Sequence, residues 1–256
     1  MKIKDKAAVI TGASRGVGKA TALALAQGGC SVLINYSRSR KEAEQTAGEV
    51  RALGVNAALF AGDVSEDRVC REMMDAAAQA FGRLDILINN AGTTRFISHG
   101  NFDEVHGDDW DRIFGVNVKG PFQCVRAARK YLEASGEGVV INVSSVAGII
   151  GAGSSIPYCA SKAALINMTI SLARALGPKI RVNSVAPGFI AGHWTQEGLG
   201  GDYETVKKKA EERSALGRVC QPEDVAAAIL SLITGSELIT GQTMVCDGGF
   251  LVGPRG

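Results

Sequence analysis

Short apolar runs rich in β-branched residues alternate along the chain with longer segments of amphipathic helical pattern. Seven runs are typical of buried strands: Ala7–Thr11, Ser31–Tyr36, Ala57–Phe60, Leu84–Asn89, Gly138–Ser144, Ile180–Ala186 and Thr243–Cys246. Six stretches between them predict helices: Gly16–Gln27, Arg40–Leu53, Asp67–Phe81, Trp110–Ala134, Pro157–Leu176 and Pro222–Ile233. Regular alternation of this kind predicts an α/β fold in which a parallel sheet is covered by helices on both faces.

A chain of 256 residues suits one large α/β domain, and we see no linker or internal repeat. We therefore expect 1–256 to form a single doubly wound, Rossmann-type domain with a seven-stranded parallel sheet. One stretch breaks the rhythm: Pro187–Gly201 is rich in glycine and carries His193, Trp194 and Thr195. Irregular segments of this length are usually lids or mobile loops, so we expect a substrate lid at about 189–213.

Charge and composition exclude several classes of function. A net charge of +2 gives no strong field to attract nucleic acid or a membrane surface. The one cationic run, Lys207–Lys209, is followed by two acids and is typical of a solvated helix face. No apolar run approaches the ~18 residues of a membrane span. The first strand begins by Ala7, which leaves no room for a signal peptide, so we expect a cytoplasmic protein.

Cysteines and histidines are scattered and give no metal-ligand spacing, so we expect no catalytic metal. The six cysteines form no C-x-x-C pair and are expected to be reduced thiols. A Ser-His-Asp hydrolase would need a G-x-S-x-G turn, which the chain lacks.

A glycine-rich turn joins the first expected strand to the first helix and reads T-G-A-S-R-G-V-G over 11–18. Glycines there allow a tight turn and let backbone N–H groups approach a pyrophosphate at the helix N-terminus. The spacing is G-x-x-x-G-x-G, not the commoner G-x-G-x-x-G. A glycine-rich turn can be no more than a turn, but its place after the first strand favours nucleotide binding.

Tyr158 and Lys162 stand four residues apart at the start of an expected helix and therefore share one face. A phenol has an ordinary pKa of about 10, and a nearby ammonium would lower it, so the pair is a plausible acid/base. Such a pair can also arise by chance. Ser145, thirteen residues before Tyr158, strengthens the assignment because it ends a strand, where open α/β sheets bind ligands.

These motifs stand in the order found in the short-chain dehydrogenase/reductase family, which the chain resembles over essentially its whole length. The 3-oxoacyl-(acyl-carrier-protein) reductase branch is the most similar. The motifs that carry the resemblance are T-G-A-S-R-G-V-G at 11–18, D-V at 63–64, N-N-A-G at 89–92, Asn117 in N-V-K-G, S-S-V-A-G at 144–148, Y-C-A-S-K at 158–162 and P-G at 187–188.

The resemblance implies a role for each catalytic position. Tyr158 would protonate the carbonyl oxygen during reduction, and Ser145 would hydrogen-bond that oxygen. Lys162 would bind the nicotinamide ribose and depress the pKa of Tyr158. Asn117 would hold a water that links Lys162 to solvent as a proton relay.

The resemblance also implies a cofactor site, with Asp63 and Val64 at the adenine and Asn90 near the adjoining ribose. Pro187, Gly188 and Ile190 would contact the nicotinamide. The full expected set of cofactor residues is Gly12, Ser14, Arg15, Gly16, Val17, Gly18, Ser37, Arg38, Asp63, Val64, Asn90, Gly92, Tyr158, Lys162, Pro187, Gly188 and Ile190. The family often has threonine where this chain has Gly192, which leaves Thr195 as the nearest substitute.

The choice of nicotinamide depends on the end of the second expected strand. Proteins of this fold that prefer NAD commonly place an acid there, whereas this chain reads N-Y-S-R-S-R over 35–40. Arg38 could pair with a 2′-phosphate, and Arg15 lies where a second guanidinium could reach it. We therefore expect NADP rather than NAD. The simpler alternative is that Arg38 and Arg40 are solvated at a helix start.

The expected function is NADP-dependent hydride transfer between NADPH and a carbonyl or secondary alcohol, in the manner of a 3-oxoacyl reductase. Alternatives are an alcohol or sugar dehydrogenase working oxidatively, or an NADP-binding sensor without turnover. The segments Thr93–Asp109 and 189–213 would wall the substrate pocket without dictating the substrate, for which an acyl thioester is one candidate. An acyl carrier protein could dock on Arg95, Arg129 and Lys130, although ordinary surface charge is the better explanation of these residues. The resemblance also implies a homotetramer.

Overall fold

Seven strands form one all-parallel sheet in the order β3-β2-β1-β4-β5-β6-β7. The computed structural model describes residues 1–254. The strands are β1 (Ala7–Ile10), β2 (Ser31–Tyr36), β3 (Ala57–Ala61), β4 (Ile86–Asn89), β5 (Gly138–Val143), β6 (Ile180–Pro187) and β7 (Thr243–Cys246). The strand order reverses between β1 and β4, the place where doubly wound sheets bind ligands. The predicted fold class is confirmed.

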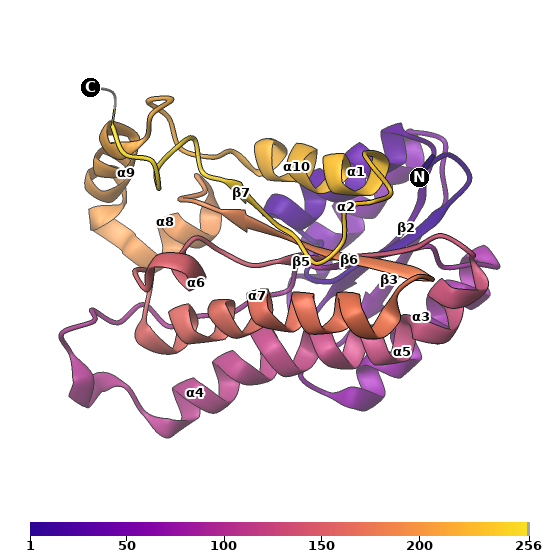
Figure 1. The fold of residues 1–256 in the computed structure, drawn as a ribbon, viewed down its shortest axis with the longest axis horizontal. Helices are drawn as coiled ribbons and strands as arrows, with labels where there is room; N and C mark the ends of the chain where they lie inside the picture. Colours follow the sequence, from indigo (N-terminus) through magenta and orange to yellow (C-terminus); the bar gives the residue numbers. More distant parts are fainter. Residues whose placement is uncertain (255–256) are drawn as a thin grey trace.

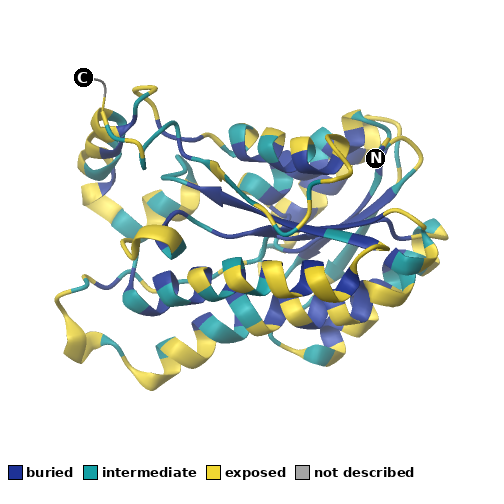
Figure 2. Cartoon of the chain, in the orientation of Figure 1, coloured by how far each residue is buried: buried dark blue, intermediate teal, exposed yellow. Residues whose placement is uncertain are grey.

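Helices cover both faces of the sheet (Figure 1). On one face lie α1 (Gly16–Gln27), α2 (Arg40–Ala52) and α10 (Pro222–Thr234); on the other lie α3 (Asp67–Phe81), α5 (Gly120–Ala134) and α7 (Ile156–Leu176). Two apolar clusters result, one on each side of the sheet. Figure 2 shows the strands buried between helices that are exposed on their outer sides.

The single helix expected over 110–134 is wrong, because this stretch is divided into three parts. α4 (Gly107–Phe114) leads into a wider π turn (Gly115–Lys119), and α5 follows. Pro121 has no N–H to donate to the preceding turn, which favours such a break. A Cβ on Gly120 would come within 2.9 Å of the Val64 side chain, so a close approach also fixes this point.

The irregular segment expected over 187–201 is wrong in part. β6 runs to Pro187, and α8 (His193–Leu199), a 3₁₀ turn (Gly200–Asp202) and α9 (Tyr203–Arg213) follow. Gly192 ends the irregular part with φ of 156°, a value that other residues rarely adopt. The cationic run 207–209 does lie on a helix, α9, as its charge pattern indicated. The short helix α6 (Ala147–Ile150) was not expected.

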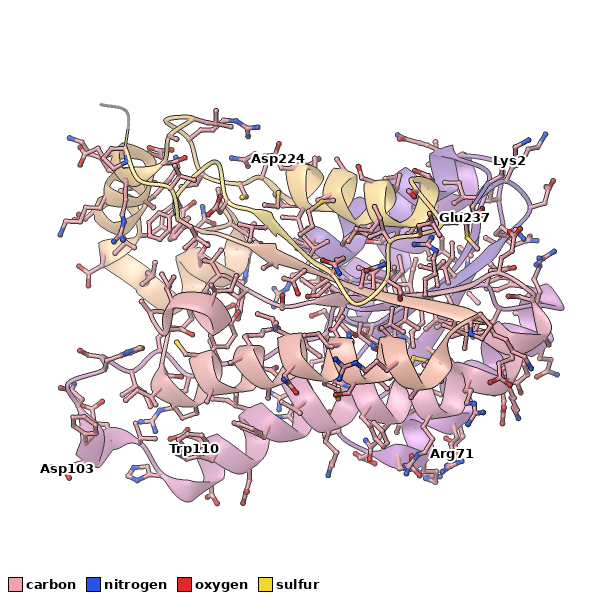
Figure 3. All side chains as sticks on the ribbon, in the orientation of Figure 1. Lys2, Arg71, Asp103, Trp110, Asp224 and Glu237 are labelled. Carbon is pink, nitrogen blue, oxygen red and sulfur yellow. The ribbon has the colours of Figure 1, made fainter. Side chains whose placement is uncertain are left out.

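Charged side chains are spread over the outer surfaces, where Figure 3 labels Arg71 on α3, Asp224 on α10 and Glu237 beyond it. All six cysteines are free thiols, and five of them are buried. Within residues 1–254, no helix has the length and apolar character required to cross a membrane. The same residues contain no cluster of three or more side chains suited to a metal ion.

Candidate active site

A cleft of about 1230 Å³ opens at the carboxyl ends of the central strands. Its lining brings together segments that follow β1, β2, β4, β5 and β6, with α8 and α9 on its outer side. All the predicted site residues line this cleft except Gly18 and Asn117. Residues far apart in the chain therefore meet where the sequence predicted.

The glycine-rich turn between β1 and α1 fits an anionic ligand. Gly12 and Gly16 have φ of 62° and 57°, and a Cβ on Gly16 would point into open space. Gly18 lies beneath the turn, where a Cβ would come within 2.5 Å of the Gly12 carbonyl oxygen. The first turn of α1 holds no acid and no side-chain cap, so its backbone N–H groups are available to a pyrophosphate.

Two asparagines hold this turn in place. The Gly12 N–H donates to Asn35 Oδ1 at 3.2 Å. Asn90 Nδ2 donates to the carbonyl oxygens of Thr11 and Gly12, each at 2.9 Å. The Asn90 side chain, expected near a ribose, is thus bound to the glycine-rich turn and supports the cleft from below.

Cations gather at the end of the cleft that follows β2. Arg38 is exposed and lines the cleft, and no salt bridge joins it to an acid within residues 1–254. Arg15 Nη1 lies 3.2 Å from His193 Nδ1, so the glycine-rich turn contacts α8 across the cleft. His193 also lies 3.2 Å from Glu197 on the next turn of α8.

Asp63, expected at the adenine, is paired with Arg112 of α4 at 2.7 Å. Burial alone would raise the pKa of Asp63, but hydrogen bonds from Ser65 and Arg112 outweigh burial and hold the pKa below its ordinary value. Sequence reasoning missed Arg112, which also lines the cleft. No local signal links two residues that lie 49 positions apart.

Ser145, not its neighbour Ser144, faces Tyr158. The Ser144 hydroxyl is buried and donates to the Val185 carbonyl oxygen at 2.9 Å. The Ser145 hydroxyl is hydrogen-bonded to Tyr158 and accepts from the Ala147 N–H at 3.1 Å. The side chain of Ser155 caps α7 by accepting from the Tyr158 N–H at 3.4 Å, which fixes the turn that carries the phenol.

Lys162 is not among the groups that set the pKa of Tyr158 in this structure, so the depression of that pKa by Lys162 stays a prediction. Burial raises the pKa of Tyr158 to about 12, and only the hydrogen bond with Ser145 opposes that rise. Lys162 Nζ lies 5.6 Å from the centre of the Tyr158 ring and donates to the Val143 carbonyl oxygen at 2.9 Å. Burial also lowers the pKa of Lys162 to about 8. At neutral pH the phenol is therefore protonated, as a proton donor must be.

Asn117 lies in the π turn and is fully buried. Its Nδ2 donates to the Thr93 carbonyl oxygen and to Ser161 Oγ, both at 3.0 Å, and its Oδ1 accepts from the Thr93 N–H at 2.8 Å. A Cβ on Gly92 would lie 3.6 Å from both Asn117 Oδ1 and Lys162 Nζ, so this glycine separates the two side chains. The side chain of Asn117 thus positions the 93 loop, and the proton relay through Asn117 stays a prediction.

The segment after β6 carries the residues expected at the nicotinamide. The Pro187 carbonyl oxygen accepts from the Val146 N–H at 3.0 Å, and Gly188 donates to Cys246 at 2.9 Å. Thr195, the substitute considered for a threonine at position 192, turns its hydroxyl onto the carbonyl oxygens of Ile190 and Gly192, at 2.8 and 3.0 Å. The Thr195 hydroxyl proton is therefore already donated to a carbonyl oxygen of the same loop.

An aromatic wall stands beside Tyr158. The ring of Trp194 from α8 packs edge-on to Tyr158 and to Phe96, with centroids 6.0 and 6.4 Å apart. Gly198 lets α8 close onto Phe96, because a Cβ there would lie 1.9 Å from that ring. Both predicted wall segments, 93–109 and 189–213, contribute to this surface.

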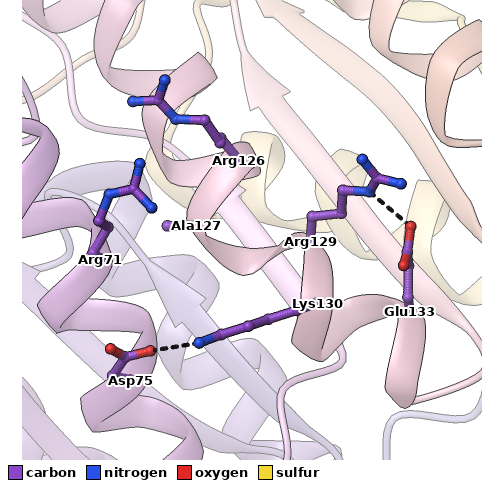
Figure 4. A pocket seen from close by; sticks show the side chains of 7 residues that line it. All are labelled: Arg71, Asp75, Arg126, Ala127, Arg129, Lys130 and Glu133. Atoms are coloured by element: carbon purple, nitrogen blue, oxygen red, sulfur yellow. Dashed lines mark hydrogen bonds and ion pairs between the residues drawn. The ribbon is translucent and has the colours of Figure 1, made fainter.

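Two of the three cations proposed for carrier docking, Arg129 and Lys130, line a separate depression instead of the cleft. Arg129 is paired with Glu133 at 2.8 Å, and Lys130 with Asp75 at 3.3 Å, beside a depression of about 410 Å³ between α3 and α5 (Figure 4). Arg95 is paired with Asp109 at 2.9 Å. None of the three lines the cleft. The docking role therefore gains no support from their position.

Comparison with known proteins decides the family. The family model described as "Enoyl-(Acyl carrier protein) reductase" matches residues 12–251. The chain belongs to the short-chain dehydrogenase/reductase family. It is 38% identical to the 3-oxoacyl-(acyl-carrier-protein) reductase FabG of Thermotoga maritima, over 98% of this chain and 100% of that protein. This short-chain dehydrogenase/reductase is therefore an oxidoreductase of carbonyl or alcohol groups, close to 3-oxoacyl reductase-like proteins.

Two other relatives differ in what their names imply. The chain is 40% identical to a protein of Streptomyces violaceoruber named as a candidate ketoacyl reductase 2 of the granaticin polyketide synthase, over 94% of both chains. A crystal structure of NAD⁺-bound xylitol dehydrogenase matches with a TM-score of 0.89 and 27% identity, over 97% of this chain and 100% of that chain. Relatives of this short-chain dehydrogenase/reductase thus include both ketoacyl reductases and an NAD-bound polyol dehydrogenase.

Proposed function

We propose that the protein is an NADP-dependent reductase of ketones, with Tyr158 as proton donor, Ser145 as the group that orients the carbonyl oxygen, and a substrate resembling a 3-oxoacyl thioester. The single observation that carries the proposal is the buried, protonated Tyr158 hydrogen-bonded to Ser145 at the inner end of a cleft whose other end is cationic. That arrangement supplies a proton donor where the carbonyl would lie.

The chain's own residues perform the acid chemistry. The nicotinamide supplies the hydride when bound. Tyr158 gives its proton to the carbonyl oxygen, and Ser145 holds that oxygen in line by a second hydrogen bond. The ammonium of Lys162 then stabilises the phenolate that forms. Trp194 packs against the phenol and is itself backed by Phe96, and this cover keeps water from the reacting groups.

Three observations favour NADP over NAD. No acid lines the cleft at the end of β2, Arg38 lies there without an acidic partner among the described residues, and Arg15 borders the same end. A 2′-phosphate would meet donors rather than a repelling carboxylate. The alternative is an alcohol or sugar dehydrogenase working oxidatively, to which the likeness with the NAD⁺-bound xylitol dehydrogenase lends weight.

The test is NADPH oxidation with a panel of 3-oxoacyl thioesters, simple ketones and sugars, followed by absorbance. We expect oxidation with the thioesters or ketones. Binding of NADPH, seen by its fluorescence, without oxidation by any member would instead indicate a sensor. Faster reduction of NAD⁺ by alcohols or sugars than oxidation of NADPH by ketones would support the oxidative alternative.

The pH dependence of reduction should follow Lys162. Burial lowers the pKa of Lys162 to about 8, so its charge is present below that pH and is lost above it. We expect kcat for reduction to be flat below about pH 7 and to fall as pH rises through about 8, because the phenolate of Tyr158 loses its stabilising cation. Lys162→Arg keeps the charge, and an unchanged alkaline fall in that variant would refute this assignment.

We also propose that 189–213 acts as a lid. α8 has no buried residue and is held mainly by the Trp194 contacts and the Arg15–His193 hydrogen bond. Segments with so few buried contacts open at low free-energy cost.

Amide hydrogen exchange in 193–199 should slow when NADP⁺ and substrate are added, while exchange in α7 should not change. Gly198→Ala should speed exchange, since its Cβ would collide with Phe96. Strong and equal protection with and without ligands would rule out the lid.

We further propose a cytoplasmic homotetramer formed by this single domain. Exposed apolar side chains support the proposal: Phe122 lies on α5, Ile170 on α7, and Leu238 and Val252 flank β7 in the sequence. When several large apolar side chains are exposed on a protein surface, they are typical of an interface between copies of the chain.

A further inference from the structure

α9 presents an unusual stripe of side chains to the cleft. Val206, Lys209, Ala210 and Arg213 all line it, and their spacing of three and four residues places them on one face of the helix. Lys209 and Arg213 are therefore two like charges one turn apart. Such a pair destabilises a helix by about as much as a pair of opposite charges would stabilise it.

The rest of α9 follows the opposite rule. Lys207 is paired with Glu211 at 3.7 Å, and Lys208 with Glu212 at 4.0 Å. On the cleft face, by contrast, the residue four positions after Lys209 is the cation Arg213 and not an acid. No salt bridge joins Lys209 or Arg213 to an acid within residues 1–254. The charge pattern thus differs between the cleft face and the solvent face of one helix.

Arg213 is also held in position. Its guanidinium lies over the ring of Phe250, 4.7 Å from the centroid, and Phe250 lines the cleft as well. The next residue, Ser214, donates to the Gly248 carbonyl oxygen at 2.6 Å, which attaches the end of α9 to the turn after β7. A cation fixed in this way loses little side-chain entropy when it binds an anion.

The acids on the cleft wall do not neutralise this pair. Asp63 is occupied by Arg112 at the far end, and Asp202, at the start of α9, makes no salt bridge with Lys209 or Arg213. Trp194 and Phe96 form an aromatic surface beside Tyr158 in the same cleft. One cleft therefore holds the proton donor, an aromatic surface and two cations.

We propose that Lys209 and Arg213 form an anion-binding subsite that selects ketones whose apolar or thioester-linked arm ends in a phosphate or a carboxylate. The proposal rests on the proposed function, because the reacting carbonyl must lie at Tyr158. The subsite binds the distal end of the substrate and takes no part in proton or hydride transfer.

The test compares substrates that differ only in the anion. One pair is acetoacetyl pantetheine and its 4′-phosphate, and the other is methyl 6-oxoheptanoate and 6-oxoheptanoate. At constant ionic strength the unaltered protein should show a kcat/KM at least about tenfold higher for one charged member, mostly through KM. Lys209→Gln and Arg213→Gln should each lower that preference about 5- to 10-fold, and the double variant should abolish it.

Lys208→Gln is the matched control, because Lys208 lies on the same helix but is paired with Glu212 and does not line the cleft. It should keep the preference. A gain for the phosphate pair alone would identify a phosphate as the ligand, and a gain for the oxo-acid pair alone a carboxylate. Equal kcat/KM for both members of both pairs, unchanged in the variants, would overturn the subsite while leaving ketone reduction intact.

Calorimetric binding of 4′-phosphopantetheine, with pantetheine as reference, to the protein carrying NADP⁺ separates the two proposals. Binding of the phosphate that is lost in the double variant but kept in Lys208→Gln supports the subsite even if no ketone is reduced, which would then count only against the proposed function. Equal binding of both compounds, with no ketone reduced, would overturn both.

Discussion

Replacing Tyr158 with phenylalanine is expected to lower kcat for ketone reduction by ~10²–10⁴-fold, the usual contribution of a positioned general acid. NADPH binding should stay nearly intact, because the aromatic ring and its contact with Trp194 remain. Burial and the hydrogen bond with Ser145 keep Tyr158 protonated at neutral pH, so no other group need supply the proton. Steady-state kinetics and a fluorescence titration with NADPH measure the two effects separately.

Neighbouring variants provide the controls. Ser145→Ala should lower kcat, whereas Ser144→Ala should not, because the Ser144 hydroxyl is turned into the sheet toward Val185. Lys162→Ala should lose both turnover and cofactor affinity. If Tyr158→Phe retained most of its activity on a good substrate, Tyr158 would not be the acid.

Removing Arg38 should weaken NADPH binding by about 10- to 150-fold, since a hydrogen bond to a charged group contributes roughly 1.5–3 kcal/mol. NADH binding should barely change, because NADH lacks the 2′-phosphate. Arg15→Ala should have the same selective effect, although it also removes the contact with His193 on α8. Arg38→Ala is therefore the cleaner test. Dissociation constants for both cofactors, measured by fluorescence, give the result.

Arg40 offers a matched control for Arg38. It lies two residues away but is paired with Glu44 at 2.8 Å and does not line the cleft, so Arg40→Ala should leave the preference for NADPH unchanged. A kcat/KM that favours NADH in the unaltered protein would show that the assignment of NADP is wrong.

The fold could be predicted because apolar strand runs and helix periodicity both agree with the same parallel sheet. The errors arise where local pattern and tertiary contacts differ. The stretch 110–134 is amphipathic throughout, yet Pro121 and the close approach of Gly120 to Val64 impose a wider turn. In 187–201 the many glycines favour a loop, so α8 could not be predicted. The position of α8 depends on contacts with Phe96 and Tyr158 rather than on an apolar face of its own.

The site could be predicted in position but not in energetics. Ligand-facing residues follow strand ends, so Ser145 and Arg38 were placed on the cleft from sequence. The raised pKa of Tyr158 comes from burial, which no spacing reveals. The charge pattern correctly predicts a helix at Lys209. That Lys209 lines the cleft while Lys207 and Lys208 do not depends on which face of the helix meets the cleft, and the sequence does not reveal this.

The most direct test of the central claim is deuterium transfer from NADPH labelled at C4 of the nicotinamide to a ketone that the panel identifies. Mass spectrometry of the product locates the label. With the unaltered protein we predict one deuterium on the carbinol carbon. With Tyr158→Phe the rate of deuterium transfer should fall by the same factor as kcat. Bound, labelled NADPH that passes no deuterium to any carbonyl of the panel would contradict the assignment of this protein as a reductase.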